Sequence, residues 1–499
     1  MKRVFACMLA LLLLASSAIL FASAETEEED TQMNKKHYGL HVEADGTMTL
    51  EGKAFYGFGL NYFGAFAHSY YDEGETPAYV AAFAAIREHN IPFVRLPLCG
   101  YYPDYYDRFD EDPEPLFACM KSILDTAEQN QVGVIVSLMW WDPAIALHVG
   151  GKRSDMGKED SAVLEYAKKY SEAVVSRFAD HPAVWGWEIG NEYNLNADLC
   201  DPEYKQFLWD MNYPGTERTD VDGYDYYTST ELAYFYAEIG KVIRKYDNYR
   251  MITTGNGEMR PYAYALFSAA KKANDKHLWT MKWDIDKLTK FNTINAIYTP
   301  DPLDTMCFHL QHGTGGSQNP AYELEFERFY RTVSSLEYFK AYADAAKAQS
   351  KALFFGEFGD MRDMEGAPDA IDKFREVAGW ITEAGIQLAA SWQFQDYTEE
   401  GINGQKLDAL SDFNVELRKN GKQELSAAWA EHTVIHEDTT DSSASSAETT
   451  VPTTTDAETT TGTASASGCG SATVGSAVIT GAVGTAAVLI AKKKKKADQ

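Results

Sequence analysis

The sequence predicts an α/β chain whose body is a (β/α)8 TIM barrel, preceded by a small β-hairpin and followed by a linker and a membrane helix. Short apolar runs alternate with segments of helical periodicity along the body, as expected for parallel βα units. There are eight such runs, and eight parallel strands joined by helices close most simply into a barrel. A hydrophobic content of 45% is enough for a large core.

The strand candidates are short, mainly apolar runs, and the helix candidates between them are each long enough for a crossover. The strands are Phe55–Phe63, Phe93–Leu98, Gly133–Trp140, Val184–Glu192, Met251–Gly257, Thr305–Gln311, Ala352–Gly359 and Leu388–Phe394. The helices include Pro77–His89, Leu116–Asn130, Ser161–Ala179, Thr228–Tyr246, Leu336–Ala348 and Ala370–Ala384.

Two segments fall outside this alternation. His41–Leu50 alternates around an Asp-Gly pair, which predicts a β-hairpin that covers the amino-terminal end of the barrel. The segment Pro261–Thr299 contains Trp279 and Trp283 and exceeds an ordinary connection, so we expect a loop insertion over the active face.

The two ends of the chain predict export and anchoring. Residues 1–24 combine a basic start, an apolar stretch and Ala22-Ser23-Ala24, the pattern of a secretory signal, and residues 25–36 form an acidic leader. The catalytic domain is expected over residues 37–436. Residues 437–471 are a Thr/Ser-rich linker too polar to fold, residues 472–491 an apolar run that could cross a membrane, and residues 492–499 a lysine-rich cytoplasmic tail. The body is then displayed at the cell surface.

The composition of the chain limits the kinds of ligand and partner that it can bind. A formal net charge of −29 argues against nucleic acid, because a phosphate backbone requires a concentrated cationic surface. After removal of the signal, the cysteines are odd in number and irregularly spaced, so no disulfide framework follows. No cluster has convincing metal-ligand spacing and no phosphate-binding loop follows a strand. We expect no cofactor, no metal, a neutral ligand and a monomer.

The chemistry is expected at the carboxyl ends of the strands. Glu192 closes the fourth strand candidate and Glu357 closes the seventh, and these strands lie across a barrel from each other. Cleaving an acetal with retention requires one carboxyl group to protonate the leaving oxygen and a second to attack the anomeric carbon, roughly 5 to 5.5 Å apart. Arg95, near the end of the second strand, could keep the nucleophile ionised. Glu188 is the rival acid, or a buried partner of Arg95.

These motifs resemble glycoside hydrolase family 5, over roughly residues 40–430. Asn191-Glu192 resembles the family's acid/base signature, in which the asparagine holds the sugar 2-hydroxyl, and Phe355–Gly359 resembles its nucleophile strand. Arg95 is similar to its second-strand arginine, His309 to its sixth-strand histidine and Trp392 to the tryptophan on which the sugar stacks.

The sequence departs from the family pattern at three places. Gln311 stands where many members have a tyrosine bonded to the nucleophile; Tyr62, His312 and Tyr322 are candidates for that role. Tyr193 replaces the usual proline after Asn-Glu, and the third strand ends in Met139–Asp142 without a histidine. These differences concern the substrate more than the reaction.

The resemblance implies a retaining, endo-acting β-glycoside hydrolase that uses Glu192 as acid/base and Glu357 as nucleophile on a β-1,4-linked mannan or glucan. Substrate contacts are expected from the side chains Asn191, Arg95, His309, Trp392, Trp141 and Tyr62. Two alternatives stay open. One is an exo-acting β-glycosidase on oligosaccharides, and the other is a non-catalytic carbohydrate-binding surface protein.

Overall fold

The computed structural model describes most of the predicted catalytic body. The described residues are 38–71, 78–200, 226–273, 279–310, 325–359, 369–394 and 401–425. The predicted signal, leader, linker, membrane run and lysine tail lie outside these ranges, as do Gln311, His312 and Tyr322. Among the helices of the described ranges, none carries an apolar stretch sufficient to traverse a bilayer.

Eight parallel strands close into a barrel, in the order β12-β13-β4-β5-β6-β7-β8-β9, and β9 pairs back onto β12. This confirms the predicted TIM barrel and each of its eight strand candidates. The strands are β4 (Gly57–Asn61), β5 (Phe93–Pro97), β6 (Gly133–Ser137), β7 (Val184–Glu188), β8 (Met251–Thr253), β9 (Thr305–Leu310), β12 (Ala352–Phe358) and β13 (Leu388–Ser391).

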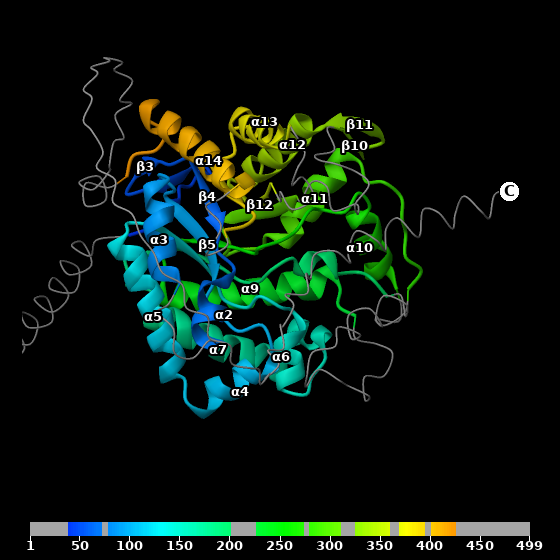
Figure 1. Ribbon diagram of the computed structural model, residues 1–499. Coiled ribbons are helices and arrows are strands. Elements are labelled where there is room, and N and C mark those ends of the chain that lie inside the picture. The colour runs from blue at the N-terminus through cyan, green and yellow to red at the C-terminus, as the bar shows by residue number, and fades with distance from the viewer. Residues whose placement is uncertain are drawn as a thin grey trace, which may run out of the picture.

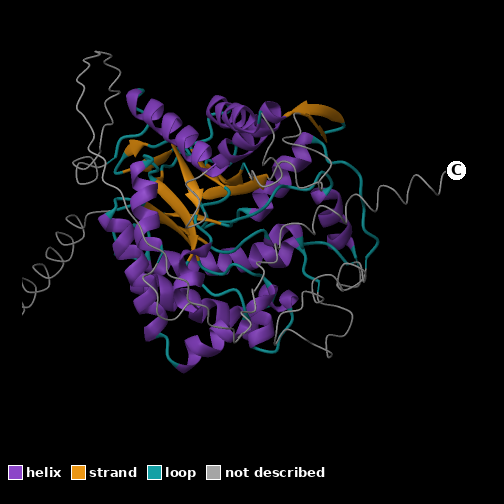
Figure 2. Cartoon of the chain, viewed as in Figure 1, coloured by secondary structure: helices purple, strands orange, loops and turns teal. Residues whose placement is uncertain are grey.

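Helices surround the strands, as Figure 2 shows by colour. They are α2 (Gly64–Tyr71), α3 (Tyr79–Glu88), α4 (Pro103–Glu111), α5 (Glu114–Gln129), α6 (Pro143–His148), α7 (Ala162–Phe178), α9 (Ser229–Tyr246), α10 (Ala263–Lys272), α11 (Leu288–Tyr298), α12 (Ser335–Lys347), α13 (Ala370–Glu383) and α14 (Gly401–Lys419). Two 3-10 turns, η1 (Arg153–Gly157) and η2 (Tyr193–Leu195), lie in the loops after β6 and β7. The main core fills the space between this ring and the strands.

Local sequence explains where several helices begin. Thr228 and Ser334 each cap a helix, α9 and α12, and each forms a reciprocal capping box with a glutamate three residues later. Ser161 caps α7 through its hydroxyl oxygen. Such caps satisfy backbone N–H groups that have no partner inside the helix. The six helix candidates from the sequence are all present within one or two residues.

The amino-terminal end of the barrel is closed by a small sheet of β1 (Leu40–Val42), β2 (Met48–Leu50) and β3 (Lys53–Ala54). Strands β1 and β2 form the predicted hairpin, and β3 adds a third strand that was not expected. Leu40 and Met48 join a second core cluster with Phe93, Trp185 and other side chains from inside the barrel. The hairpin therefore seals that end, and the opposite end is left for the site.

The predicted loop over Pro261–Thr299 is wrong in part, because most of it forms α10 and α11. Helix α11 packs on α9 and α12 as the crossover helix between β8 and β9. Residues 279–287 between the two helices have no regular structure. A second excursion, the hairpin of β10 (Glu325–Arg328) and β11 (Arg331–Ser334), follows β9. Figure 1 shows α10 and this hairpin away from the small amino-terminal sheet.

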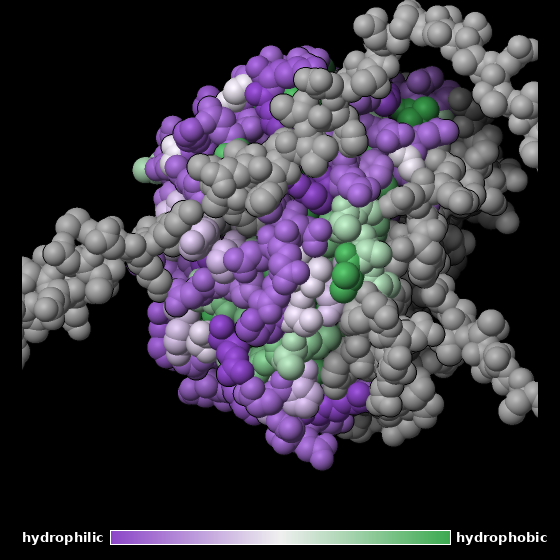
Figure 3. All heavy atoms as spheres, turned by 60° about the vertical axis from the view of Figure 1, so that its left-hand side comes forward, coloured by the Kyte–Doolittle hydropathy of each residue, from purple (hydrophilic) through white to green (hydrophobic). Residues whose placement is uncertain are grey.

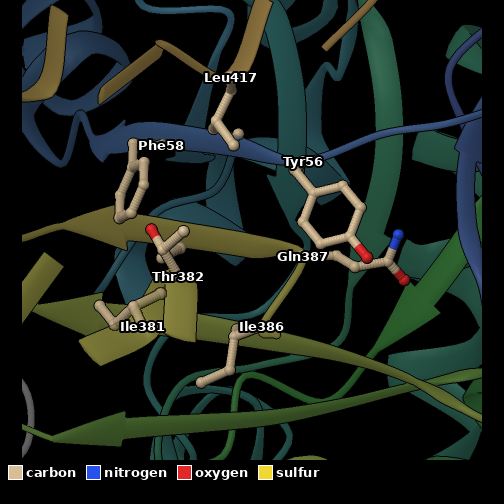
Figure 4. Close-up of a pocket in the computed structure, with 9 residues that line it drawn as sticks. Tyr56, Phe58, Ile381, Thr382, Ile386, Gln387 and Leu417 are labelled. Carbon is tan, nitrogen blue, oxygen red and sulfur yellow. The ribbon is translucent and has the colours of Figure 1, made fainter. Parts of the chain in front are cut away.

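The face shown in Figure 3 is mainly hydrophilic, with an apolar area near its centre. Figure 4 shows a small cavity beside Tyr56, Ile386 and Leu417, where β4 and β13 begin. Its volume of about 10 Å³ suits one water molecule. Because it lies at the amino-terminal end, it has no part in the chemistry at the other end.

Candidate active site

Three charged side chains meet inside the carboxyl end of the barrel. Arg95 comes from β5, Glu188 from the last position of β7 and Glu357 from β12. Arg95 and Glu188 are fully buried, and Glu357 is 3% exposed. Buried charges are tolerated only when they are paired and hydrogen-bonded, so the remaining contacts of Arg95 decide what this cluster can do.

All five N–H groups of Arg95 have acceptors. Its Nε and Nη2 atoms lie 2.8 Å from the Glu188 carboxylate, and Nη2 also lies 2.8 Å from the amide oxygen of Asn191. Its Nη1 atom lies 2.9 Å from the amide oxygen of Asn61 and 2.6 Å from Oε1 of Glu357. The predicted role as the charge beside Glu357 therefore fits the geometry. The predicted substrate contact is wrong, because no donor of this guanidinium is left for a ligand.

The charge of Arg95 is held firmly. Burial works against a charged guanidinium, but the carboxylates of Glu188 and Glu357 outweigh it and raise the pKa of Arg95. The ring of Trp140 covers the guanidinium, with 4.6 Å between Cζ and the ring centroid. Ser137 donates a hydrogen bond to Glu188. Glu188 is thus a structural partner of Arg95, as the sequence allowed, and does not reach a ligand.

Asn61 is a positioning residue that the sequence analysis missed. Its amide oxygen accepts from Arg95, and its amide nitrogen donates to the backbone carbonyl of Gly356 at 2.9 Å and of Ala390 at 3.2 Å. It thereby ties β4 to the strand that carries Glu357 and to β13. A sequence signal existed: Asn61 is a buried polar residue at the end of a strand, the position singled out for the other candidates.

Glu357 faces inward because of an irregularity in β12. The pairing with β9 joins Phe355 to Phe308 and then Glu357 to His309, so Gly356 is an extra residue in the strand. A Cβ atom at Gly356 would lie 2.5 Å from Nε2 of His309 and 2.8 Å from Sγ of Cys307. Only glycine fits there without displacement of buried neighbours. Strand β7 has a similar shift of register between Val184 and Gly186.

Glu192 sits just beyond β7 in a left-handed backbone conformation, with φ 56°. Its N–H donates to the carbonyl of Gly255 at 2.7 Å, which holds the turn. The Glu192 side chain is 28% exposed, against 3% for Glu357, so it is the more accessible of the two. Burial raises the pKa of Glu192 to about 7, and the opposing attraction of Arg95 is too weak to prevent this.

His309 joins the two carboxylates. Its Nδ1 lies 3.1 Å from Oε1 of Glu192 and 3.5 Å from Oε1 of Glu357. Burial lowers the pKa of His309 to about 4, so the ring is neutral near pH 7, and an Nδ1–H can donate to Glu192. One carboxylate oxygen of Glu192 and one of Glu357 lie within 4.8 Å of each other. The two acids therefore face one cleft.

The environments of the two carboxyl groups differ. Burial raises the pKa of Glu357 above its ordinary value, while His309 and Arg95 hold it down and Glu192 raises it further. Glu357 forms a direct ion pair with Arg95, whereas Arg95 acts on Glu192 only through a longer-range electrostatic attraction. When the pair of carboxyl groups holds one proton, we therefore assign that proton to Glu192 and the negative charge to Glu357. These different protonation states suit different roles.

Aromatic side chains gather at the ends of β13, β4 and β6, next to the charged cluster. Trp392 is 7% exposed, stacks on Trp140 at 6.4 Å and lies 5.9 Å from Phe63 between ring centroids. Its indole N–H has no acceptor among the residues that the structure describes. Trp141 is half-buried and packs against Tyr102. The positions of Trp392 and Trp141 are compatible with the sugar contacts predicted for them.

Tyr62 is placed differently from the prediction. Its ring is completely buried and packs edge-on against Phe83 of α3 and Phe394. Since Asn61 points into the barrel, its neighbour must point outward toward the helices. The predicted substrate contact of Tyr62 is therefore wrong. Asn191 is half-buried, and its amide oxygen accepts from Arg95, which turns the amide nitrogen away from that guanidinium; among the described residues this nitrogen has no hydrogen-bond partner.

Three sets of metal-ligating side chains lie close together among the described residues. The sets are Glu192, His309 and Glu357; Glu188, Cys307 and His309; and Asp125, Glu128 and His181. In the second set, burial raises the pKa of Cys307 well above its ordinary value, so the thiol stays protonated. In the third, Nδ1 of His181 accepts from the N–H of Ala183, so Nε2 carries the proton that a metal would have to replace. The first set is the catalytic cluster itself.

Comparisons with known proteins agree with this picture. The family model described as Cellulase (glycosyl hydrolase family 5) matches residues 49–398. Among solved structures, the endo-1,4-beta-mannanase from Rhizomucor miehei is 15% identical with a TM-score of 0.50, over 76% of this chain and 99% of that one. A variant of the glycoside hydrolase family 5 mannosidase from Rhizomucor miehei is 13% identical with a TM-score of 0.50, over 77% and 99%. No curated protein matches in sequence.

Proposed function

The chain belongs to glycosyl hydrolase family 5 and is a glycoside hydrolase. We propose that it cleaves internal bonds of a β-1,4-linked polysaccharide and that it retains the anomeric configuration. The observation that carries the retaining mechanism is the approach of the Glu192 and Glu357 oxygens to within 4.8 Å. Retaining enzymes place their carboxyl groups roughly 5 to 5.5 Å apart, whereas inverting enzymes leave roughly 6.5 to 9.5 Å for a water molecule.

The proposed reaction has two steps. Glu192 donates its proton to the glycosidic oxygen while Glu357, held ionised by Arg95, attacks the anomeric carbon and displaces the leaving group. Glu192, now a carboxylate, then removes a proton from water, which attacks the same carbon and releases Glu357. His309 lies between the two carboxylates: its Nδ1 is hydrogen-bonded to Glu192 and lies 3.5 Å from Oε1 of Glu357. The amide nitrogen of Asn191 is placed to bind a sugar hydroxyl.

The stereochemical course tests this mechanism directly. Proton NMR of the first product should show the newly formed reducing end in the β configuration, before it equilibrates to the α form. The reason is that two successive inversions at the anomeric carbon restore its configuration. Appearance of the α form first would contradict the assignment of Glu357 as nucleophile.

The substrate proposed is mannan, with glucan second. This preference rests on the family resemblance, and the two Rhizomucor miehei structures carry the names of a mannanase and a mannosidase. Hydrolysis of mannan, cellulose, xyloglucan and xylan with sizing of the products tests both linkage and mode of action. An endo-acting enzyme releases fragments of mixed length at once. Release of single sugars or disaccharides alone would favour the exo-acting alternative.

The pH dependence follows from the raised pKa of Glu192. Glu192 must be protonated to act as the acid, and it carries its proton below about pH 7 and loses it above. We expect kcat/KM for a polysaccharide to fall as pH rises through about 7, roughly tenfold per unit. An aryl glycoside with a strongly acidic phenol needs no protonation of its leaving group. Bond cleavage in that substrate, followed as the first burst of phenol, should lack this fall; a fall of equal size would contradict the role of Glu192.

We also propose that the enzyme is exported and anchored in the cell membrane. This proposal is supported by the basic and apolar start of the chain, the Thr/Ser-rich segment 437–471, the apolar run 472–491 and the lysines that follow it. Deletion of residues 472–499 should shift activity from the membrane fraction to the medium. Activity that stays with the membrane in that variant would refute the anchor.

A further inference from the structure

The two halves of the barrel mouth differ in character. In the strand order, β13 and β4 to β6 form one half, and β7 to β9 with β12 form the other. Trp392, Phe63 and Trp140 lie at the ends of the first group. Glu192, the proposed proton donor to the leaving oxygen, follows β7 on the opposite half. Because Glu192 protonates the leaving oxygen, the leaving portion of a bound polysaccharide is expected on the side of β7 and of the loop that follows β8.

A continuous wall leads from Glu192 along the loop that follows β8. Gly257 lies directly beside Glu192, because a Cβ atom there would be 3.2 Å from Oε1 of Glu192. The next residue, Glu258, pairs with Arg328 at the end of β10 and accepts from the hydroxyl of Tyr338 at 3.1 Å. The Glu258 side chain is 27% exposed and that of Arg328 is 13% exposed. Partly exposed charges here suit hydroxyl groups of a sugar.

The wall ends in an exposed tryptophan. Tyr262 follows Glu258 by four residues in the loop after β8 and is half-buried. Trp283 packs edge-on against Tyr262, with 4.7 Å between ring centroids, and is 38% exposed. Within the described ranges, the only other large apolar residues that are exposed to this degree or more are Val80, Leu288 and Tyr330. A partly exposed indole offers an apolar surface on which a sugar ring can stack.

The loop that presents Trp283 is fixed, although it has no regular structure. The N–H of Asp286 donates to the carbonyl of Pro261 at 2.7 Å. The Asp286 carboxylate accepts from the N–H groups of Tyr264 and Ala265 at the start of α10, at 2.6 and 3.1 Å. The segment is thereby tied to the same residues that carry Tyr262. A ring held in advance loses little entropy when a ligand stacks on it.

From this continuity we propose that Glu258, Tyr262 and Trp283 form a binding surface for the leaving, aglycone part of the polysaccharide, with the Trp283 ring as the stacking contact farthest from the bond that is cleaved. The inference rests on the proposed function, since Glu192 defines which side the leaving part occupies. It predicts that the enzyme uses several sugar units beyond the cleavage point, as an endo-acting enzyme does.

Hydrolysis of long and short substrates tests the surface. In Trp283→Ala, we expect kcat/KM on soluble mannan or hydroxyethyl cellulose to fall by about 3- to 10-fold, mainly through KM, which is the effect of one lost stacking contact. An aryl β-glycoside of a single sugar does not reach Trp283, so its kcat/KM should be unchanged. Trp283→Phe should restore most of the loss. Val80→Ala, an exposed apolar residue on α3, is the matched control and should behave as wild type.

The outcomes separate the surface from the reaction. Equal losses on polysaccharide and aryl glycoside, or no loss on polysaccharide, would overturn the surface and leave the hydrolase intact. If the wild type cleaves no glycoside, the proposed function fails. Binding of polysaccharide then tests whether the proposed surface exists. In that case Glu357→Gln and Glu357→Gln/Trp283→Ala are run in native gels containing each soluble polysaccharide. Equal retardation of the two proteins would overturn the surface; weaker retardation of the double variant would support it.

Discussion

Replacing Glu357 by glutamine is expected to lower kcat on every substrate by roughly 10⁴-fold or more, since it removes the atom that forms the covalent bond. The change keeps the shape of the side chain and an oxygen that can accept from Arg95, which stays paired with Glu188 at 2.8 Å. The protein should therefore fold and bind oligosaccharide with near-normal affinity, as measured by calorimetry.

A matched control is Glu383→Gln, the same change at an exposed carboxylate of α13 that pairs with Lys340. It should leave kcat and KM unchanged, because exposed ion pairs contribute little. Residual hydrolysis in Glu357→Gln within tenfold of the wild type would remove this residue from the role of nucleophile. Loss of both activity and oligosaccharide binding would instead indicate a structural defect.

Replacing Glu192 by glutamine has the second largest expected effect, and its size depends on the leaving group. For polysaccharide, kcat should fall by roughly 10² to 10⁴-fold, because both protonation of the leaving oxygen and activation of water are lost. For an aryl glycoside with a strongly acidic phenol, the first step needs no acid. The glycosyl-enzyme should then accumulate, giving a burst of phenol followed by slow turnover.

A small anionic nucleophile separates this role from a merely structural one. Azide needs no general base, and the neutral glutamine does not repel it, so it should accelerate turnover of the aryl glycoside by Glu192→Gln and form the β-glycosyl azide. The same anion should not rescue Glu357→Gln through a β product, since no covalent intermediate forms there. Absence of rescue in Glu192→Gln, together with a normal fold by circular dichroism, would favour a different acid.

The fold could be predicted from the sequence because its signals are long and repeated. Each barrel strand is buried along its whole length, so it reads as an apolar run, and each crossover helix has a clear periodicity. Helices α10 and α11 were not predicted. Their segment contains Trp279, Trp283 and many lysines, and the burial of Phe291 and Ile294 that stabilises α11 depends on distant helices.

The site was predicted in part, and its errors have a common cause. Glu192, Glu357, Arg95 and His309 meet as expected, because strand ends in a barrel converge regardless of their separation in sequence. The direction in which a side chain points was harder to predict. Tyr62 was chosen by residue type although its neighbour Asn61 faces inward. The same alternation would have identified Asn61.

The extra residues in β7 and β12 have a consequence for tolerance to mutation. At these points two successive residues face the barrel interior, which has room for one side chain, so the other must be glycine. At Gly356 even a methyl group would press on the imidazole that joins the two carboxylates. A residue with no reactive group thus transmits any enlargement straight to the proton donor and the nucleophile. Selection for activity, rather than for folding alone, would govern which amino acids this buried position accepts.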